Sequence, residues 1–106
     1  MNDKRNGKGY ERYKNGNIYE GDFKDGKAHG GGILKWKSGE SYDGQWIKGL
    51  KTGYGIWKGI EGEYYIGEWK ESRTHGKGLY VWSNGDKYEG EWKNGLKHGK
   101  GSDIFQ

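Results

Sequence analysis

The segment "YEGEWKNGLKHGKG" at residues 88–101 combines a tyrosine, a tryptophan, several charges and four glycines in fourteen positions. Three upstream segments follow the same pattern: "YEGDFKDGKAHGGG" at 19–32, "YDGQWIKGLKTGYG" at 42–55 and "YIGEWKESRTHGKG" at 65–78. Their first tyrosines are spaced 23 residues apart. A fixed period of about 20–50 residues is the signature of a repeat architecture.

The period divides the chain into three full repeats at 19–41, 42–64 and 65–87. A partial repeat at 7–18 precedes them, a truncated repeat at 88–106 follows them, and residues 1–6 are expected to form an N-terminal tail. Because the pattern stops within a repeat, we expect either an excerpt from a longer array or an array capped by a partner.

The composition favours a folded chain with a thin core. The 106 residues leave room for one domain. Aliphatic residues are few, but six tryptophans and nine tyrosines stand at fixed spacing. Large rings can bury the area that the missing aliphatic residues cannot. With a formal net charge of only +4, this pattern favours one folded layer, stabilised by neighbouring repeats, over a disordered chain.

The sequence contains no cysteine, which suits an intracellular protein. No apolar run approaches the roughly 20 residues that a membrane-spanning helix needs. The N-terminal residues "MNDKRNGKGY" do not resemble a signal peptide. We therefore expect a soluble, cytoplasmic protein that reaches a membrane only by attachment to its surface.

Within each repeat the apolar residues recur with a period of two. Tyr88, Gly90 and Trp92 alternate with charged residues, as in a strand with one face in water. The 23 glycines disfavour helices, at about 1 kcal/mol each in a helix interior, and the absence of proline fits uninterrupted strands. The sequence thus predicts an all-β, elongated, single-layer antiparallel sheet of about nine strands.

Two kinds of connection alternate along the chain. A polar loop such as "KNGLKH" at 93–98 separates the strands of one repeat, and a tight turn such as "KSG" at 37–39 leads into the next. If the tight turn is a three-residue loop with glycine in the left-handed conformation, Trp36 pairs with Glu40. A two-residue turn would instead place Trp46 opposite Gly31 and lose the regularity.

The three-residue turn sets each large ring opposite a glycine. Trp46 then lies opposite Gly30, and the other pairs are Phe23 with Gly7, Trp69 with Gly53, and Trp92 with Gly76. We predict that these rings cover backbone that carries no side chain. The predicted structural glycines are Gly30, Gly32, Gly53, Gly55, Gly76, Gly78, Gly99 and Gly101.

Residues 7–105 closely resemble the MORN repeat family (membrane occupation and recognition nexus). Its repeats read Tyr-acid-Gly-acid-Trp-Lys, then a glycine-containing loop, Gly-x-Gly and an aromatic strand. The resemblance implies antiparallel hairpins stacked into a twisted, groove-like sheet, and roles in scaffolding, membrane association and cytoskeletal or ciliary assemblies. Some relatives carry such repeats beside enzyme domains, including phosphoinositide kinases. A regulatory segment of a larger enzyme is therefore a further reading.

The chain departs from the family pattern in its middle repeats. Gly59 stands where the neighbouring repeats have Trp36 and Trp82, and Trp57, two residues earlier, is predicted to supply the missing ring. Thr52 replaces the loop histidine, Ile66 replaces an acid, and Ser72 replaces the loop glycine.

The residues that could carry chemistry are explained by the repeat. His29, His75 and His98 occupy equivalent positions, and one repeat of two strands spans about 10 Å. They would be too far apart to share one zinc ion. Acid pairs such as Glu89 and Glu91 project from a charged strand face. The sequence predicts a non-enzymatic protein with no catalytic residue, no metal site and no cofactor.

The basic loops are one candidate binding surface. They would form a column of cations about 10 Å apart at one edge of the sheet, which consists of Lys27, Lys51, Arg73 and Lys97. Such a column could meet anionic lipid at about 1 kcal/mol per cation. The alternative is that these loops only keep the chain soluble. Nucleic acid is disfavoured, because the net charge is modest and no binding motif is present.

The aromatic face is the preferred candidate, as a groove that binds a peptide or a helix of a protein partner. The predicted partner-binding residues are Tyr19, Phe23, Trp36, Tyr42, Trp46, Trp57, Tyr65, Trp69, Trp82, Tyr88 and Trp92. The end strands add a third surface, because an unpaired edge invites another chain. The segment "GKGSDIF" at 99–105 is therefore a candidate for self-association.

Overall fold

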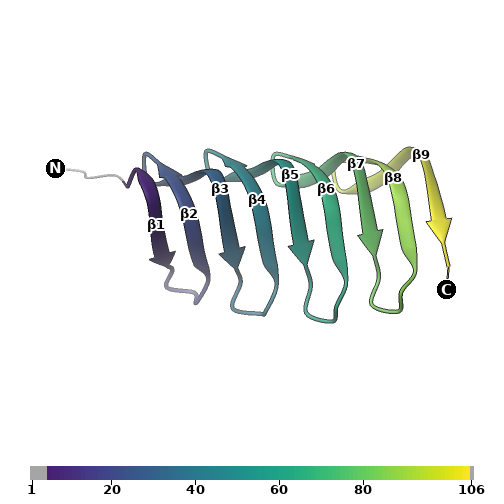
Figure 1. Ribbon diagram of the computed structural model, residues 1–106, viewed down its shortest axis with the longest axis horizontal. Coiled ribbons are helices and arrows are strands. Elements are labelled where there is room, and N and C mark those ends of the chain that lie inside the picture. The colour runs from purple at the N-terminus through teal and green to yellow at the C-terminus, as the bar shows by residue number, and fades with distance from the viewer. Residues whose placement is uncertain (1–4, 106) are drawn as a thin grey trace.

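The computed structural model describes residues 5–105, and these form one open antiparallel sheet (Figure 1). Each strand pairs with the next along the chain: β1 (Gly7–Arg12), β2 (Ile18–Lys24), β3 (Lys27–Lys35), β4 (Ser41–Ile47), β5 (Leu50–Lys58), β6 (Tyr64–Lys70), β7 (Arg73–Val81), β8 (Lys87–Lys93) and β9 (Leu96–Ile104). The sheet measures 54 × 25 × 17 Å. The predicted all-β, elongated single layer is confirmed. Residues 1–4 of the predicted tail, and Gln106, lie outside the described residues.

The tight turns between repeats have the predicted register. The Trp36 amide donates to the Glu40 carbonyl at 2.9 Å, and Gly39 has φ 107°, in the left-handed region that glycine favours. Downstream, Gly30 pairs with Trp46, as predicted. The other three predicted pairs are also present: Gly7 with Phe23, Gly53 with Trp69, and Gly76 with Trp92.

The connections within a repeat are shorter than predicted. The expected polar loops are two-residue turns in which both residues have positive φ, as in Asn94 (51°) and Gly95 (83°). This is the twist that a type I′ hairpin requires. The second turn residue also joins neighbouring repeats, since the amide of Gly95 donates to the carbonyl of Thr74 at 3.1 Å. The amide of Ser72 donates in the same way to the carbonyl of Lys51 at 2.9 Å, although a φ of 65° is strained for serine.

Each hairpin contains an irregularity in its pairing just after the glycine of its first strand, and in three of the four one residue of that strand is left unpaired. Gly67 pairs with Gly78 and Trp69 with Thr74, so that one residue of β6 lies opposite three of β7. Glu68, the residue in the gap, accepts a hydrogen bond from the Lys77 amide at 2.6 Å. The equivalent Glu91 accepts from the Lys100 amide at 2.9 Å. This acid of the repeat therefore holds backbone in place, a role beyond the solvated face that the sequence suggested.

The tyrosines cover the glycine backbone. A β-carbon on Gly78 would overlap the hydroxyl group of Tyr65, whose O–H donates to the Glu68 carbonyl at 3.0 Å. The same arrangement recurs at Gly32, Gly55 and Gly101, each beneath the tyrosine hydroxyl of its own repeat. These glycines have no side chain because the tyrosine ring takes its place.

The tryptophans do not cover the glycines opposite them, so this part of the prediction was wrong. A β-carbon at Gly30 or Gly76 would meet the acidic side chains of Asp22 or Glu68, and not an indole ring. The reason is the irregularity beside these glycines, where Gly30 (φ 94°), Gly53 (65°), Gly76 (68°) and Gly99 (59°) all take positive φ. Their structural role is conformational freedom in a bend.

The indoles instead bond to the covered backbone and link the repeats. Trp69 Nε1 donates to the carbonyl of Gly55 at 3.1 Å. The Trp69 ring packs edge-on against Tyr42 and Tyr65, with centroids 5.1 and 5.2 Å apart. Trp46 and Trp92 repeat this pattern. One continuous row of edge-to-face rings, a favourable geometry, therefore forms the core of a single sheet.

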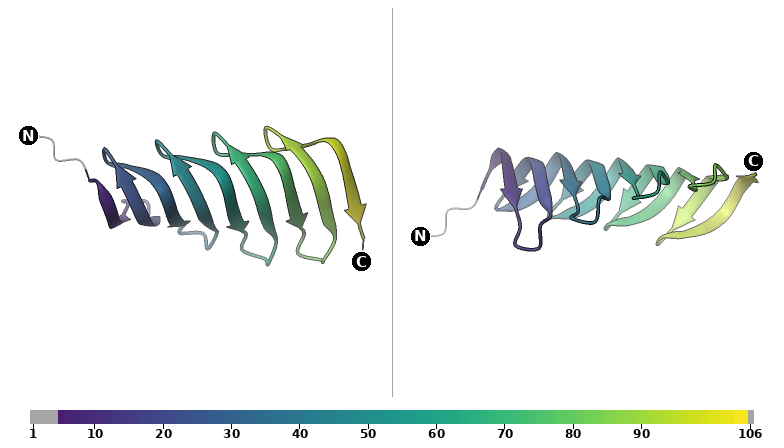
Figure 2. Two further views of the ribbon diagram at one scale, coloured as in Figure 1. Left: turned by 45° about the horizontal axis from the view of Figure 1, so that its top comes forward. Right: turned by 90° about the horizontal axis from the view of Figure 1, so that it is seen from below.

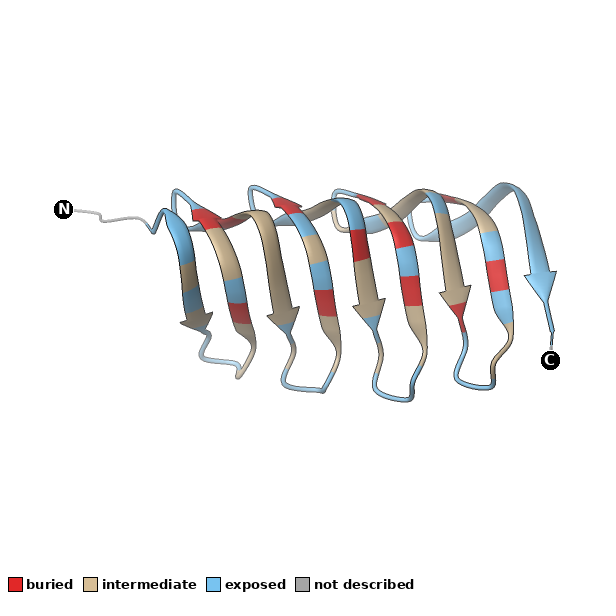
Figure 3. Cartoon of the chain, in the orientation of Figure 1, coloured by how far each residue is buried: buried red, intermediate tan, exposed pale blue. Residues whose placement is uncertain are grey.

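The buried residues recur on β2, β4, β6 and β8, whereas β9 is exposed along its whole length (Figure 3). Figure 2 shows the sheet as one layer from two further directions. Among residues 5–105, no helix is long and apolar enough to cross a membrane.

Candidate partner-binding site on the aromatic face

The aromatic face is the side of the sheet that carries the tyrosine and tryptophan rings, and most of those rings are closed to a partner. Eight of the predicted partner-binding residues are buried core: Tyr19, Phe23, Tyr42, Trp46, Tyr65, Trp69, Tyr88 and Trp92. The remaining three, Trp36, Trp57 and Trp82, are partly accessible, and Trp82 is 36% exposed. Of the residues predicted to bind a partner, these three offer ring surface to solvent.

Two of the four predicted lipid-binding cations turn onto this face. Lys51 Nζ lies 5.2 Å from the Trp36 ring centroid and 5.3 Å from that of Trp69. Lys97 Nζ lies 5.3 Å above Trp82 and 4.7 Å above Tyr88. All four distances fit cation–π contacts. The other two cations, Lys27 and Arg73, are exposed at the hairpin turns, and Arg73 also lines the cavity described below.

Burial also acts on the charge of Lys51. Desolvation lowers the pKa of its amine, and the neighbouring carboxylate of Glu40 partly opposes that shift. Among residues 5–105, no carboxylate lies within ion-pair distance of Lys51, whereas Lys97 Nζ binds Asp103 Oδ1 at 2.8 Å. The Lys51 amine is thus a half-buried cation without a counter-ion at contact distance.

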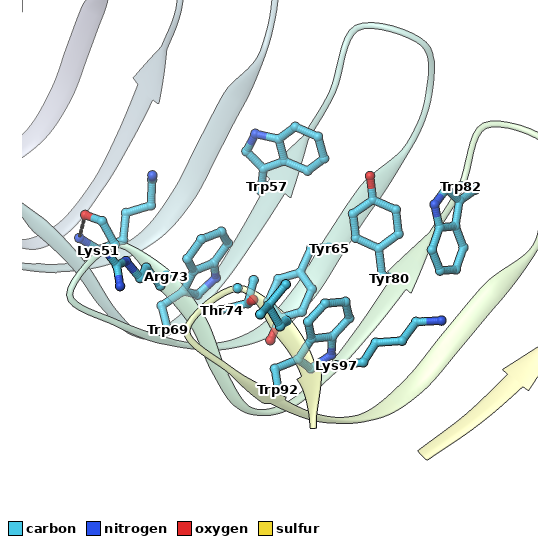
Figure 4. A pocket seen from close by; sticks show the side chains of 13 residues that line it. Lys51, Trp57, Tyr65, Trp69, Arg73, Thr74, Tyr80, Trp82, Trp92 and Lys97 are labelled. Carbon is cyan, nitrogen blue, oxygen red and sulfur yellow. Dashed lines mark hydrogen bonds between the residues drawn. The ribbon is translucent and has the colours of Figure 1, made fainter. Parts of the chain in front are cut away.

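A cavity of about 560 Å³ lies between these two lysines. Figure 4 shows Trp57, Tyr80 and Trp82 in a row on one side of it, with Trp69, Tyr65 and Trp92 on the other. Trp57 and Tyr80 stack at 6.2 Å between centroids, and Tyr80 and Trp82 approach to 4.7 Å. The Trp57 indole donates to Glu40 Oε1 at 3.3 Å, which fixes its orientation.

The cavity lies where the repeat loses two side chains. Lys51 covers Trp36, Tyr42 and Trp69, and one period later the equivalent of Lys51 is Thr74. The equivalent of Trp36 is Gly59. Because Lys51 lies over Trp36, both large groups are missing at one level of the stacked hairpins, although Gly59 and Thr74 belong to neighbouring repeats. Trp57 contributes a ring to the cavity wall, as the sequence indicated, but the space remains open.

Two polar atoms in this region have no partner. Among the described residues, Thr74 Oγ1 and His75 Nδ1 are buried side-chain atoms without a hydrogen bond. Buried polar groups are usually paired. Thr74 lines the cavity, although its hydroxyl oxygen is itself buried.

Sequence reasoning missed Tyr80 and Thr74 as site residues. The signal for both was present in the 23-residue phase: Tyr80 stands one period after Trp57, and Thr74 stands between Lys51 and Lys97. The small residues Gly59 and Thr74, which stand where other repeats have large side chains, mark the position of the cavity in the sequence.

The three histidines do not form one site together. His29, His75 and His98 stand on β3, β7 and β9, and His29 Nδ1 accepts a bond from the Lys48 amide at 3.4 Å. No group of three or more potential metal ligands occurs within the described part of the chain. The aromatic face presents aromatic rings and amines, which are groups that bind a ligand.

Comparison with known families finds the MORN repeat five times, at residues 1–18, 19–41, 42–64, 65–87 and 88–102. No curated protein matches the chain. MORN repeats generally serve as non-catalytic interaction modules. The stacked hairpins, their recurrent tyrosines and glycines, and these five matches agree, and the chain belongs to the MORN repeat family.

Proposed function

We propose that this chain is a non-enzymatic scaffold module that binds a protein partner, as a peptide or a helix, on its aromatic face. The observation that carries the proposal is the accessible row Trp57, Tyr80 and Trp82, bracketed by the amines of Lys51 and Lys97. Aromatic rings rimmed by charge are common anchors of protein interfaces. A cytoskeletal or ciliary assembly is the setting that the family resemblance favours.

The contrast between the two faces supports this choice. On the outer face, opposite the aromatic face, a hollow beside Tyr54 and Ile66 is also lined by charges of both signs: Lys77, Glu89, Glu91 and Lys100. The cavity on the aromatic face is lined by six rings, and its charged lining residues are all cations. The aromatic face therefore offers more desolvated ring surface, the usual source of binding energy.

The test is a displayed peptide library selected on the immobilised chain. Peptides that bind the parent chain should lose at least about tenfold in affinity for Tyr80→Ala and Trp82→Ala, as truncated aromatic anchors do. Tyr54→Ala is the matched control, because Tyr54 is 65% exposed on the other face. If Tyr54→Ala weakens the peptides more than the other two variants do, the aromatic face is not the site.

A second candidate is a peripheral membrane module that binds anionic lipid. The observation that favours it is the exposure of Lys27, Lys48 and Arg73 at the hairpin turns. Sedimentation with anionic liposomes should then fall steeply between low and physiological salt, because screened surface charges lose their attraction. Absence of binding even at low salt would exclude this candidate. The remaining reading, a regulatory segment of a larger enzyme, depends on what the gene encodes beyond residue 106.

A further inference from the structure

On the basis of the proposed function, we propose that the cavity between Lys51 and Lys97 receives one bulky apolar side chain of an acidic peptide. The carboxylates of that peptide, on either side of the apolar residue, would bind the two lysine amines.

The cavity is a local feature of this sequence and not a general property of the array. Thr74 and Gly59 replace the lysine and the tryptophan that their counterparts Lys51 and Trp36 place over the core. At Lys51 the amine already lies over the rings, so a ligand has less room there. The space at Thr74 has no such cover.

The walls of the cavity favour an apolar side chain of the ligand. Six rings line it, and about 560 Å³ falls within the range of small ligand sites, which is roughly 300–1,000 Å³. The rings of Trp57 and Tyr80 stand almost parallel, with 22° between their planes. A phenylalanine or leucine entering here would be desolvated on several sides.

The charges around the cavity favour a ligand that carries carboxylates. The charged residues that line it are Lys51, Arg73 and Lys97. Two nearby acids are already engaged, since Glu40 accepts from Trp57 and Asp103 binds Lys97. A third acid, Glu63, acts on Tyr80 through its charge.

The chain itself shows how a carboxylate would sit. Asp103 of β9 binds Lys97 Nζ at 2.8 Å while that amine lies over the rings of Trp82 and Tyr88. Lys51 has the same position over its rings without such a carboxylate among residues 5–105. A peptide carboxylate at Lys51 would complete the arrangement that Asp103 completes at Lys97, and a second one would compete with Asp103.

The geometry sets the spacing of the ligand's charges. Lys51 and Lys97 stand in equivalent positions two repeats apart, which corresponds to four strand spacings, or about 19 Å. An extended peptide rises about 3.3 Å per residue, so two acids about six residues apart would span them. Side chains of an extended peptide alternate between two faces, so the apolar residue would stand two or four positions after the first acid, near Thr74.

The experiment uses a fluorescein-labelled nonapeptide with glutamate at its second and eighth positions, phenylalanine at its fourth, on the same face as the glutamates, and serine and glycine elsewhere. Its binding to the whole chain is followed by fluorescence anisotropy. Replacing the phenylalanine by alanine, or both glutamates by lysine, should each weaken binding by at least about tenfold. Equal binding of the charge-reversed peptide would overturn the acidic assignment.

Variants of the chain locate the site. Thr74→Leu fills the cavity without charge, and Thr74→Lys restores the side chain found at Lys51; both should weaken the nonapeptide by at least about tenfold. Ile66→Leu on the outer face is the matched control and should leave binding unchanged. Circular dichroism and the urea midpoint confirm that each variant is folded. A folded Thr74→Leu that binds as the parent does would overturn the proposed cavity.

The outcomes separate this inference from the proposed function. If the nonapeptide fails to bind while library peptides still require Tyr80 and Trp82, the acidic anchor is wrong and the aromatic face remains the site. If the affinity of the library peptides is also unchanged by Tyr80→Ala and Trp82→Ala, both proposals are wrong.

Discussion

The ring of Tyr65 occupies the space that a side chain at Gly78 would need, and its hydroxyl bonds to the Glu68 carbonyl at 3.0 Å. Tyr65 is only 1% exposed although the protein consists of one sheet. Because the glycine leaves the backbone bare, the tyrosine lies flat on the neighbouring strand and is covered in turn by Trp69 and Trp92. The following predictions rest on this arrangement.

Gly78→Ala should destabilise the chain by about 1–3 kcal/mol, as overpacking of a core does. The new methyl group would overlap the ring of Tyr65, which is held on both sides. Gly59→Ala is the control, since its methyl group would meet only the end of the flexible Glu63 side chain. Urea unfolding followed by tryptophan fluorescence measures both. An equal cost for the two variants would contradict the account.

Glu68→Ala should cost about 1–3 kcal/mol, because it removes the acceptor of the Lys77 amide, which donates at 2.6 Å. Glu68→Gln should cost less, since Gln45 occupies the equivalent position of the preceding repeat. Amide hydrogen exchange at Lys77 provides the measurement. Unchanged protection of that amide in Glu68→Ala would show that the carboxylate does not hold the bend.

Stability should fall at alkaline pH. Burial raises the pKa of Tyr19 and Tyr42 to about 12, and burial raises the pKa of Tyr65 as well. The unfolded chain releases phenolic protons near pH 10 and the folded chain keeps them, so this stability is complete below about pH 10 and is lost as the pH rises toward 12. The lowered pKa of Lys51 acts in the opposite sense, as one group against three.

Urea midpoints between about pH 9 and 11.5 measure this loss. Tyr65→Phe should show a smaller fall over the same interval, although its stability at neutral pH drops by about 1 kcal/mol with the lost hydrogen bond to Glu68. Midpoints that do not change across the interval would mean that the tyrosines titrate alike in both states.

The exposed strand β9 predicts self-association of the 106-residue chain. Leu96 and Ile104 are exposed on it, and in the described sheet only β8 pairs with β9. Light scattering should show a mass that increases with concentration, and Ser102→Lys should reduce the increase by placing a charge on the edge. A mass that stays monomeric at all concentrations would remove this surface from consideration.

The register of the sheet was predictable because it depends on local turn chemistry. The glycine of a three-residue turn, such as Gly39, fixes the pairing of Trp36 with Glu40, and the period of two propagates it along the strands. The two-residue turns were missed because their sequences vary: Asn94-Gly95 carries the usual signal, but Glu71-Ser72 does not. Ser72 takes its φ of 65° because its amide is held by Lys51.

The burial of the rings could not be predicted from the alternation of residues. The irregularity at Glu68, where one residue lies opposite three, changes the direction of the side chains beyond it. Although Trp69 pairs with Gly53, its indole bonds to the Gly55 carbonyl, and a β-carbon at Gly53 would meet Gln45 instead. The cavity at Thr74 was not predicted either. It forms where Gly59 and Thr74 replace a tryptophan and a lysine, and these two positions come together only in the folded sheet.

The most direct test of the central claim is a double-mutant cycle between Tyr65→Leu and Gly78→Ala, measured as free energies of unfolding in urea. If the ring is the reason for the glycine, Gly78→Ala should cost about 1–3 kcal/mol in the parent and less than about half of that beside Tyr65→Leu, because the methyl group then has room. Additive costs would show that the glycine is required for some other reason, and would contradict the claim that tyrosine rings on bare backbone hold this single sheet together.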